Sequence, residues 1–380
     1  MLSIAFAGSA LLSAWAAGDI AGAGPTLVLV AGTTIVLVVG RRVAPLRRAP
    51  LITGVIALGC IVAVSGWVGV AWHFAPWGLE DSGIYRAATT LTYANAAAGF
   101  LVPISLLALA RLAQEPGSAP SALAATILLV GVGATLSRAG MLALIAGLIV
   151  LARLMGRRPI LAAVGPPVAG AVVALTGLLP SITGNARPLP AATCCLIGVA
   201  LGTLRGWRKR PPVGVLVGLS AAAASLLLIA GAWQGGTTTS LRSRVTPESS
   251  DRLGEAGAAL RVASQHPLLG TGPGRASLSW TDPHGGYLLA RYAHDEYLQV
   301  LAEQGVLGAL VIVALVIAIN WGARQGRATI LPEIWAGAVA GLVALAGHSA
   351  FDFLWHVPAL PLLAALLVTA CTLPTPKEST

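Results

Sequence analysis

The stretch GVLGALVIVALVIAINW, residues 305–321, contains no charged side chain. A helix needs about 20 predominantly apolar residues to cross the hydrocarbon core of a bilayer, and a somewhat shorter helix crosses where its flanking residues reach the interface. The stretch therefore predicts a membrane-spanning helix. Arg324 and Arg327 follow it closely, as basic residues do on the cytoplasmic side of a membrane.

Similar apolar runs recur along the whole chain. They predict an all-α polytopic membrane protein with about twelve transmembrane helices. The runs cover residues 1–17, 25–40, 50–72, 91–110, 121–137, 139–152, 159–179, 189–204, 212–233, 305–321, 334–355 and 357–373. The first run lacks the basic region of a cleaved signal peptide, so we expect it to remain as the first span.

The composition excludes an ordinary soluble protein. Hydrophobic residues make up 56% of the 380 residues and charged residues only 10%, against roughly 25% charged in soluble domains. The formal charge of +10 comes mostly from arginines scattered between apolar runs, so it indicates membrane topology and gives no sign of a nucleic-acid partner.

The distribution of basic residues predicts the orientation. With both termini in the cytoplasm, 15 of the 24 basic residues fall on the cytoplasmic side, and six of the other nine lie in one long loop, which translocates regardless of charge. We therefore divide the chain into helices one to nine (1–233), an extracytoplasmic loop (234–304), where function is expected to concentrate, and the last three helices with a short tail (305–380). This arrangement predicts a multi-pass plasma-membrane protein, and the alanine, glycine and arginine bias of the sequence indicates a bacterium, in which this is the inner membrane.

The long loop is predicted to contain two short amphipathic helices. The first starts at Ser249 or Ser250 and ends at His266-Pro267, where helical periodicity stops. The glycine-rich segment 270–274 predicts a turn. A second helix is expected over 286–303, with Tyr287, His294 and Tyr297 on one face.

Three charged residues are candidates for chemistry. Arg138 interrupts an apolar region at an outward turn, where a cation is costly and can pair with an anion; a side chain reaching the interface is the alternative. His294 precedes a span and is suited to accept a proton near neutral pH, although packing on a helix face explains it equally. Arg252 is either a second cation for the same ligand or a solvated helix charge. Arg86 is a weaker candidate of the same kind.

The order of several segments carries a resemblance. Ser137-Arg138-Ala139-Gly140 comes first, then Arg252, then HPLLGTGPG (266–274), and finally HDEYLQVLAEQG (294–305). This combination resembles the O-antigen ligase and O-antigen polymerase family of bacterial membrane glycosyltransferases, most clearly over residues 120–310. The resemblance implies that His294 is the base on an acceptor hydroxyl, and that Arg138 and Arg252 hold the diphosphate of a polyprenyl-linked glycan donor.

The chain departs from the family pattern at two points. Asp295 follows the histidine where the family often has asparagine, and this carboxylate either raises the basicity of a nearby imidazole or faces water. The family commonly has a tryptophan shortly after the loop arginine, where this chain has Leu253-Gly254-Glu255-Ala256. Arg261 is therefore the alternative to Arg252, and we predict that Arg86, Arg261 and Arg291 contribute to substrate binding.

The reaction that the resemblance implies requires no cofactor. A departing diphosphate is neutralised either by a metal on carboxylates or by fixed cations. The sequence has no Asp-x-Asp pair but does have arginines on the outward side, which favours metal-independent transfer. Asp282, His284, His294 and Asp295 lack the spacing of a zinc site, so no metal site is predicted. The expected partners are the polyprenyl-diphosphate-linked glycan donor, a glycan, lipid or protein acceptor, and membrane lipids.

A different class of function is kept as an alternative. Three ionisable residues lie four positions apart in and directly after the run 334–355: His348, Asp352 and His356. On a continuous helix they would share one face. Such a face is typical of a proton relay and favours a proton-coupled transporter or a flippase of lipid-linked glycans. A purely structural membrane protein is the least favoured class, because it needs no loop rich in arginine, histidine and aromatic residues.

Overall fold

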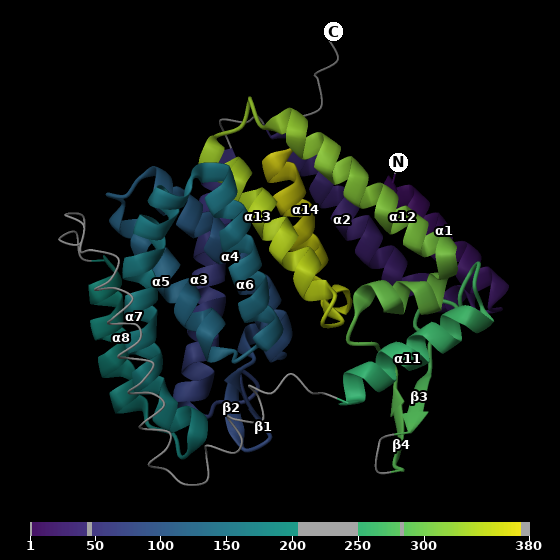
Figure 1. The fold of residues 1–380 in the computed structure, drawn as a ribbon, viewed down its shortest axis with the longest axis horizontal. Coiled ribbons are helices and arrows are strands. Elements are labelled where there is room, and N and C mark those ends of the chain that lie inside the picture. Colours follow the sequence, from purple (N-terminus) through teal and green to yellow (C-terminus); the bar gives the residue numbers. More distant parts are fainter. Residues whose placement is uncertain (1, 44–47, 204–249, 282–284, 374–380) are drawn as a thin grey trace. The chain divides into compact units, whose positions relative to one another are not determined.

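The computed structural model describes residues 2–43, 48–203, 250–281 and 285–373. Within these ranges the protein is mostly helical, and its contacts divide the chain into two compact units, each of which is described by itself (Figure 1). Unit 1 comprises Met1–Pro45, Glu248–Ile330 and Ala346–Thr380; unit 2 comprises Leu46–Pro247 and Leu331–Leu345.

Unit 2 is a helical bundle with one short antiparallel hairpin. Its elements are α3 (Arg48–Trp72), β1 (Gly78–Asp81), β2 (Ile84–Ala87), η3 (Thr89–Leu91), α4 (Ala94–Gln114), α5 (Ala119–Ala134), α6 (Arg138–Met155), α7 (Arg157–Thr183), α8 (Pro188–Thr203) and most of α13 (Pro332–Ser349). Helix α4 is central: it contacts α3, α5, α6 and α7, and nearly all of its apolar window is buried. Its small and aliphatic side chains allow neighbouring helices to approach on every side.

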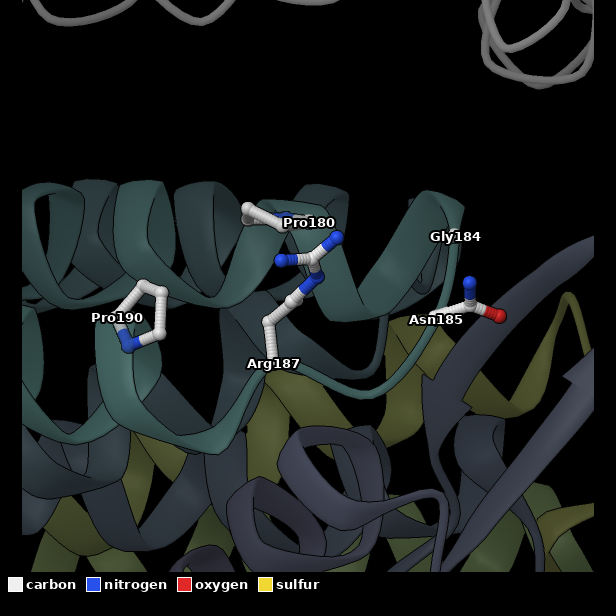
Figure 2. Close-up of a pocket in the computed structure, with 5 residues that line it drawn as sticks. All are labelled: Pro180, Gly184, Asn185, Arg187 and Pro190. Carbon is white, nitrogen blue, oxygen red and sulfur yellow. The ribbon is translucent and has the colours of Figure 1, made fainter.

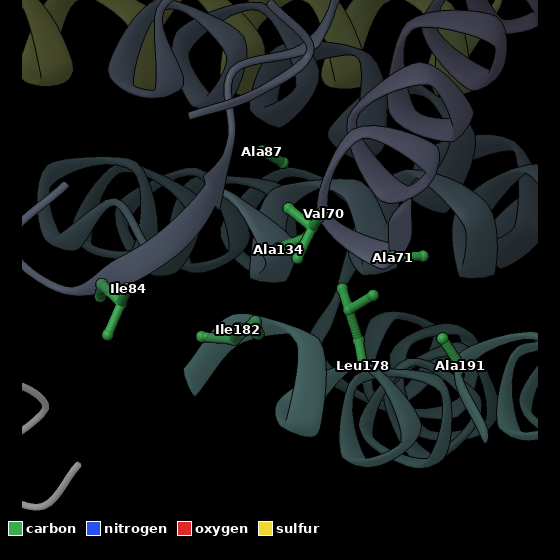
Figure 3. Close-up of a cluster of buried hydrophobic side chains, with 8 residues drawn as sticks. All are labelled: Val70, Ala71, Ile84, Ala87, Ala134, Leu178, Ile182 and Ala191. Atoms are coloured by element: carbon green, nitrogen blue, oxygen red, sulfur yellow. The ribbon is translucent and has the colours of Figure 1, made fainter. Parts of the chain in front are cut away.

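One end of unit 2 is closed by a buried apolar cluster (Figure 3). The cluster brings together the end of α3, strand β2, the end of α5, the end of α7 and the start of α8. Its members are Val70, Ala71, Ile84, Ala87, Ala134, Leu178, Ile182 and Ala191. The helices therefore run up and down, and every second connection returns to this end.

Unit 1 contains the described part of the predicted loop and the helices that pack against it. Its elements are α1 (Leu2–Ala16), η1 (Ile20–Ala23), α2 (Gly24–Arg42), α11 (Ser250–Gln265), β3 (Leu278–Thr281), β4 (Tyr287–Ala290), α12 (Glu296–Gly326), the last residues of α13, η5 (Leu354–His356) and α14 (Ala359–Cys371). Helix α12 packs against α1, α11 and α14, and α11 also packs against β3. The hairpin β3–β4 pairs Leu278 with Ala290 and Thr281 with Tyr287.

Helix α12 is broken at Gly305, and the glycine-rich turn fills the break. Gly305 has φ 63° and ψ −162°, a conformation that an L side chain rarely adopts. The break frees backbone groups, which pair with the preceding loop: Val306 N–H donates to the Pro267 carbonyl (2.8 Å) and Gly272 N–H to the Glu303 carbonyl (2.9 Å). There is no room for a side chain, since a Cβ on Gly305 would lie 2.4 Å from the carbonyl carbon of Leu268.

The expected spans are recovered in part. Six described helices are long and apolar enough to cross a membrane, and shorter apolar helices accompany them; the six are Ile20–Arg42, Arg48–Trp72, Ala94–Gln114, Arg138–Met155, Arg157–Thr183 and Glu296–Gly326. The expected span 212–233 lies outside the described residues, so the count of twelve stays a prediction. The division of the chain into 1–233, 234–304 and 305–380 stays one as well.

The described residues are mostly helical, as expected, with two short pairs of antiparallel strands, Gly78–Asp81 with Ile84–Ala87 and Leu278–Thr281 with Tyr287–Ala290. Two expectations about local structure were wrong. The helix expected over 286–303 starts only at Glu296, and the preceding Tyr287–Ala290 is a strand, so His294 precedes the helix. Helix α13 stops at Ser349 and does not continue to residue 355.

Segments predicted to face outward meet at one end of unit 1. The turn after α1 reaches the glycine-rich turn through an ion pair between Asp19 and Arg275 (3.5 Å). The start of α12 reaches the connection between α13 and α14, where the backbone N–H of Trp355 donates to the Glu296 carboxylate. The described part of the predicted loop therefore contacts both short connections.

Candidate active site

His294 and Glu255 form a tight pair at this end of unit 1. Nδ1 of the imidazole lies 2.6 Å from the Glu255 carboxylate oxygen Oε2. The Glu255 side chain is 9% exposed and the His294 side chain 32%. The buried carboxylate thus holds one ring nitrogen, and Nε2 is the atom left to exchange a proton with a substrate.

The backbone around His294 is fixed residue by residue. The N–H of Ala293 donates to the Gln299 side-chain oxygen (2.7 Å), and the N–H of His294 donates to Glu255 Oε2 (3.3 Å). The Asp295 carboxylate caps α12 by accepting from the N–H groups of Tyr297 and Leu298 (2.9 and 3.0 Å). The sequence left two roles open for Asp295, and the structure shows that it caps the helix.

Glu255 is placed by the packing of α11 on the hairpin. A Cβ on Gly254 would lie 2.2 Å from Cδ1 of Trp280 in β3, so only glycine lets the indole approach α11 at this point. Glu255 occupies the buried face of α11 together with Ala258 and Ala259. Sequence reasoning missed its role, although a carboxylate on the apolar face of an amphipathic helix was the available signal.

The surroundings make His294 a stronger base. Its hydrogen bond with Glu255 raises the pKa of the imidazole above the ordinary value, and the negative charges of Glu255 and Asp352 act in the same direction. Partial burial and the positive charge of Arg252 oppose this shift without cancelling it. A carboxylate-oriented imidazole of this kind is suited to general base catalysis.

Arg252 lies in the same electrostatic neighbourhood, one turn before Glu255 on α11. Its charge acts on both His294 and His348. The side chain is half-buried, and its guanidinium makes no hydrogen bond or ion pair with another residue in the part of the chain that the structure describes. The structure thus brings together two of the three predicted catalytic residues, His294 and Arg252.

Arg261 and Arg291 lie in the same unit but have protein contacts. Arg261 is exposed and donates from Nη2 to the carbonyl of Ser279 (2.9 Å), which ties α11 to β3. The Arg291 guanidinium carbon lies 5.4 Å from the centroid of the Tyr292 ring. Both arginines are accessible, and their role in substrate binding stays a prediction.

The other two predicted arginines belong to unit 2. Arg138 is exposed and is the first residue of α6, directly after Ser137, whose hydroxyl caps the helix by accepting from the Gly140 N–H (3.1 Å). Arg86 is 9% exposed and donates to the Thr135 carbonyl (2.9 Å), Asp81 (2.7 Å) and Asn95 (2.9 Å). This geometry gives Arg86 a structural task, which is to tie the hairpin to the ends of α4 and α5. Substrate contacts of either arginine stay predictions.

Unit 2 also has a hollow of about 350 Å³ at the turn between α7 and α8, lined by Pro180, Gly184, Asn185, Arg187 and Pro190. Figure 2 shows the Arg187 side chain extending toward Pro180. The backbone of Arg187 is anchored because its N–H donates to the Ser181 hydroxyl (2.9 Å). The lining is exposed, and it contains neither His294 nor any other predicted site residue.

The residues behind the transport alternative do not share a helix face. His348 is in the last turn of α13, Asp352 follows the end of that helix, and His356 is in η5. Their four-residue spacing therefore has no helical meaning, because the helix ends at Ser349. Asp282 and His284, two of the residues weighed for a metal site, lie outside the described residues.

Comparison with known proteins supports the resemblance found in the sequence. Residues 184–313 match the model of the O-antigen ligase family. No curated protein matches the chain significantly. The matched segment is roughly a third of the chain and includes α11, the glycine-rich turn, the hairpin β3–β4 and the start of α12. The match confirms the resemblance to the O-antigen ligase and polymerase family over the segment that holds Arg252, Glu255 and His294, in a mostly helical chain with several helices suited to cross a membrane.

Proposed function

We propose that the protein is a glycosyltransferase of the outer leaflet of the bacterial inner membrane. It moves a glycan from a polyprenyl diphosphate carrier to the hydroxyl of a glycan, lipid or protein acceptor, as an O-antigen ligase or polymerase does. The observation that carries the proposal is the His294–Glu255 pair, in which a buried carboxylate holds Nδ1 and leaves Nε2 for the acceptor.

In the proposed reaction, the acceptor oxygen attacks the anomeric carbon of the donor sugar. The acceptor proton passes to Nε2 of His294, and the bond between the anomeric carbon and the phosphate oxygen breaks with its electron pair on the diphosphate. Attack opposite the leaving group inverts the anomeric configuration. Glu255 stabilises the imidazolium that forms, as a carboxylate does behind a catalytic histidine.

Arg252 neutralises the departing diphosphate. Its charge lies near His294, and it is not committed to a described carboxylate. A fixed cation acts most strongly where charge develops during the reaction. We propose that the transfer is metal-independent, because arginines are present on the predicted outward side and the sequence has no Asp-x-Asp pair. Arg138 is proposed for the same task.

The test is glycan transfer in proteoliposomes that contain a polyprenyl-diphosphate-linked glycan and a metal chelator. The native protein is compared with His294→Gln, Arg252→Gln and Arg138→Gln. The matched control is His266→Gln, which changes an exposed histidine of the same unit. We expect transfer by the native protein and the control, and a loss of about 10²–10⁴-fold in His294→Gln.

Two results would contradict the proposal. Transfer that survives in His294→Gln at the native rate rules out this base. If the native protein transfers nothing but carries the lipid-linked glycan across the bilayer, the protein is a flippase. If the native protein transfers glycan only without the chelator, the transfer needs a metal ion, and only the proposal of metal independence is wrong.

A further inference from the structure

A second imidazole and carboxylate pair lies beside the first. Nδ1 of His356 is 3.3 Å from Oε1 of Glu296, the first residue of α12. The Glu296 side chain is 1% exposed and the His356 side chain 30%, so the pair repeats the arrangement of Glu255 and His294. The Glu296 carboxylate also accepts the backbone N–H of Trp355, which fixes the segment that carries His356.

The two imidazoles share one aromatic neighbour. The Phe353 ring centroid lies 5.2 Å from that of His294 and 6.4 Å from that of His356, and both contacts are edge-to-face. Tyr292 belongs to the same group, with its ring centroid 5.5 Å from that of Phe353 and 4.3 Å from that of His356. Two half-exposed imidazoles therefore border the same aromatic surface, and a substrate bound against Phe353 meets both.

The charges around His356 favour its protonated form. Burial lowers the pKa of this imidazole, but its hydrogen bond with Glu296 and the charges of Glu296 and Glu303 raise it to a net value above the ordinary one. The positive charge of Arg291 lowers the pKa and so opposes this shift. The described charged groups that act on His356 are Glu296, Glu303 and Arg291. The Glu296 and Glu303 carboxylates on α12 thus favour the protonated form of His356, in which Nε2 carries a proton that a ligand can accept.

We propose that His356 is a second catalytic residue, which donates a proton to the departing diphosphate while His294 accepts one from the acceptor hydroxyl. The proposal rests on the transferase function proposed above. When the bond between the anomeric carbon and the phosphate oxygen breaks, its electron pair stays on that oxygen, and the Nε2–H proton of His356 moves to it. His294 ends the reaction protonated and His356 neutral, so the total number of protons is unchanged, and exchange with water resets both rings.

The pH dependence of transfer tests this assignment in the full-length protein. A neutral base and a protonated acid give a bell-shaped profile of kcat against pH. His294 produces the acid-side fall and His356 the alkaline-side fall. We expect His356→Gln to reduce kcat by about 10²–10⁴-fold and to abolish the alkaline-side fall, while the acid-side fall stays. His356→Lys should retain part of the activity and move the alkaline-side fall to higher pH, because the ordinary pKa of lysine is about 10.4.

The control is His266→Gln, whose profile should match that of the native protein. If the native profile has no alkaline-side fall, or if His356→Gln keeps that fall at the native pH, the inference is wrong even where transfer is intact. Native protein that transfers nothing contradicts the proposed function itself. Thermal unfolding of each variant separates misfolding from lost chemistry, and a native profile without an alkaline-side fall contradicts the inference whether or not the variants fold.

Discussion

Two charged side chains of this protein contrast in how the fold uses them. Arg86 in unit 2 is nearly buried and donates to a carbonyl, a carboxylate and an amide. His294 in unit 1 is half-buried and is held from one side only, by Glu255. Arg86 donates three hydrogen bonds to its neighbours, whereas one ring nitrogen of His294 has no hydrogen-bond partner among the described residues. The number of protein partners thus separates a charge that stabilises the fold from a side chain that we propose to react.

The largest expected effect is on stability, and it tests the structural role of Arg86. Arg86→Met removes the hydrogen bonds to the Thr135 carbonyl and to the Asn95 side-chain oxygen, and it removes the ion pair with the half-exposed Asp81. We expect a loss of about 2–4 kcal/mol in the free energy of unfolding. Thermal unfolding in detergent, followed by tryptophan fluorescence, measures it. Arg158→Met is the matched control, because Arg158 is exposed in the first turn of α7. Equal stability of both variants would refute the structural task of Arg86.

The next effect is on activity, and it tests how Glu255 acts on His294. Glu255→Gln removes the charge that raises the pKa of His294, so the pKa falls toward the ordinary value. The base must be neutral to act, so the acid-side fall of activity moves to lower pH. The maximal rate drops by about tenfold or more, since a weaker base drives proton transfer less. The profile of kcat against pH measures both changes, and an unmoved acid-side fall would show that Glu255 does not tune His294.

The same pair predicts a pH dependence of stability. A raised pKa of His294 contributes stability that is fully present below the unfolded-state pKa of about 6.5. The contribution is lost as the pH rises through the higher folded-state pKa. Glu255→Gln should therefore lose more stability at pH 5 than at pH 9. Unfolding temperatures of both proteins at the two pH values give the comparison, and a larger loss at pH 9 would reverse the sign and contradict the pairing.

The smallest expected effect separates Asp295 from the catalytic pair. Asp295→Ala removes the cap of α12 and should cost about 1 kcal/mol of stability. Asp295→Asn keeps a good capping residue and should be nearly neutral. Neither change should move the acid-side fall of activity, because Glu255 holds His294. The pH profile and the unfolding temperature of each variant are measured together. If the acid-side fall shifts in Asp295→Asn, Asp295 also affects the pKa of His294.

Much of the fold follows from the sequence because apolar runs in a bilayer have few alternatives to helices. The expected segments 50–72 and 159–179 became α3 and α7 with ends shifted by a few residues. The hairpins could not be predicted, since strands of four residues carry little periodicity. Tyr287–Ala290 looked helical only because the pattern was continued across the cap at Asp295.

The sequence suggested His294 and Arg252 as neighbours in one site, but it did not predict the hydrogen-bond partner of His294. His294 and Arg252 lie in one unit, as the order of motifs implied. The partner of His294 could not be found from neighbours in the chain, because Glu255 is 39 residues away and reaches it only when α11 packs on the hairpin. The nearby Asp295 was the more obvious carboxylate, yet its oxygens point at the backbone of α12.

The break at Gly305 has a consequence for how the protein is made. The ribosome synthesises Pro267 and Gly272 before α12. The loop that pairs with the broken part of this helix is therefore made before the helix itself. A buried backbone polar group left without a partner costs free energy comparable to a lost hydrogen bond. We therefore expect the start of α12 to reach its final structure only once the preceding loop has packed against it.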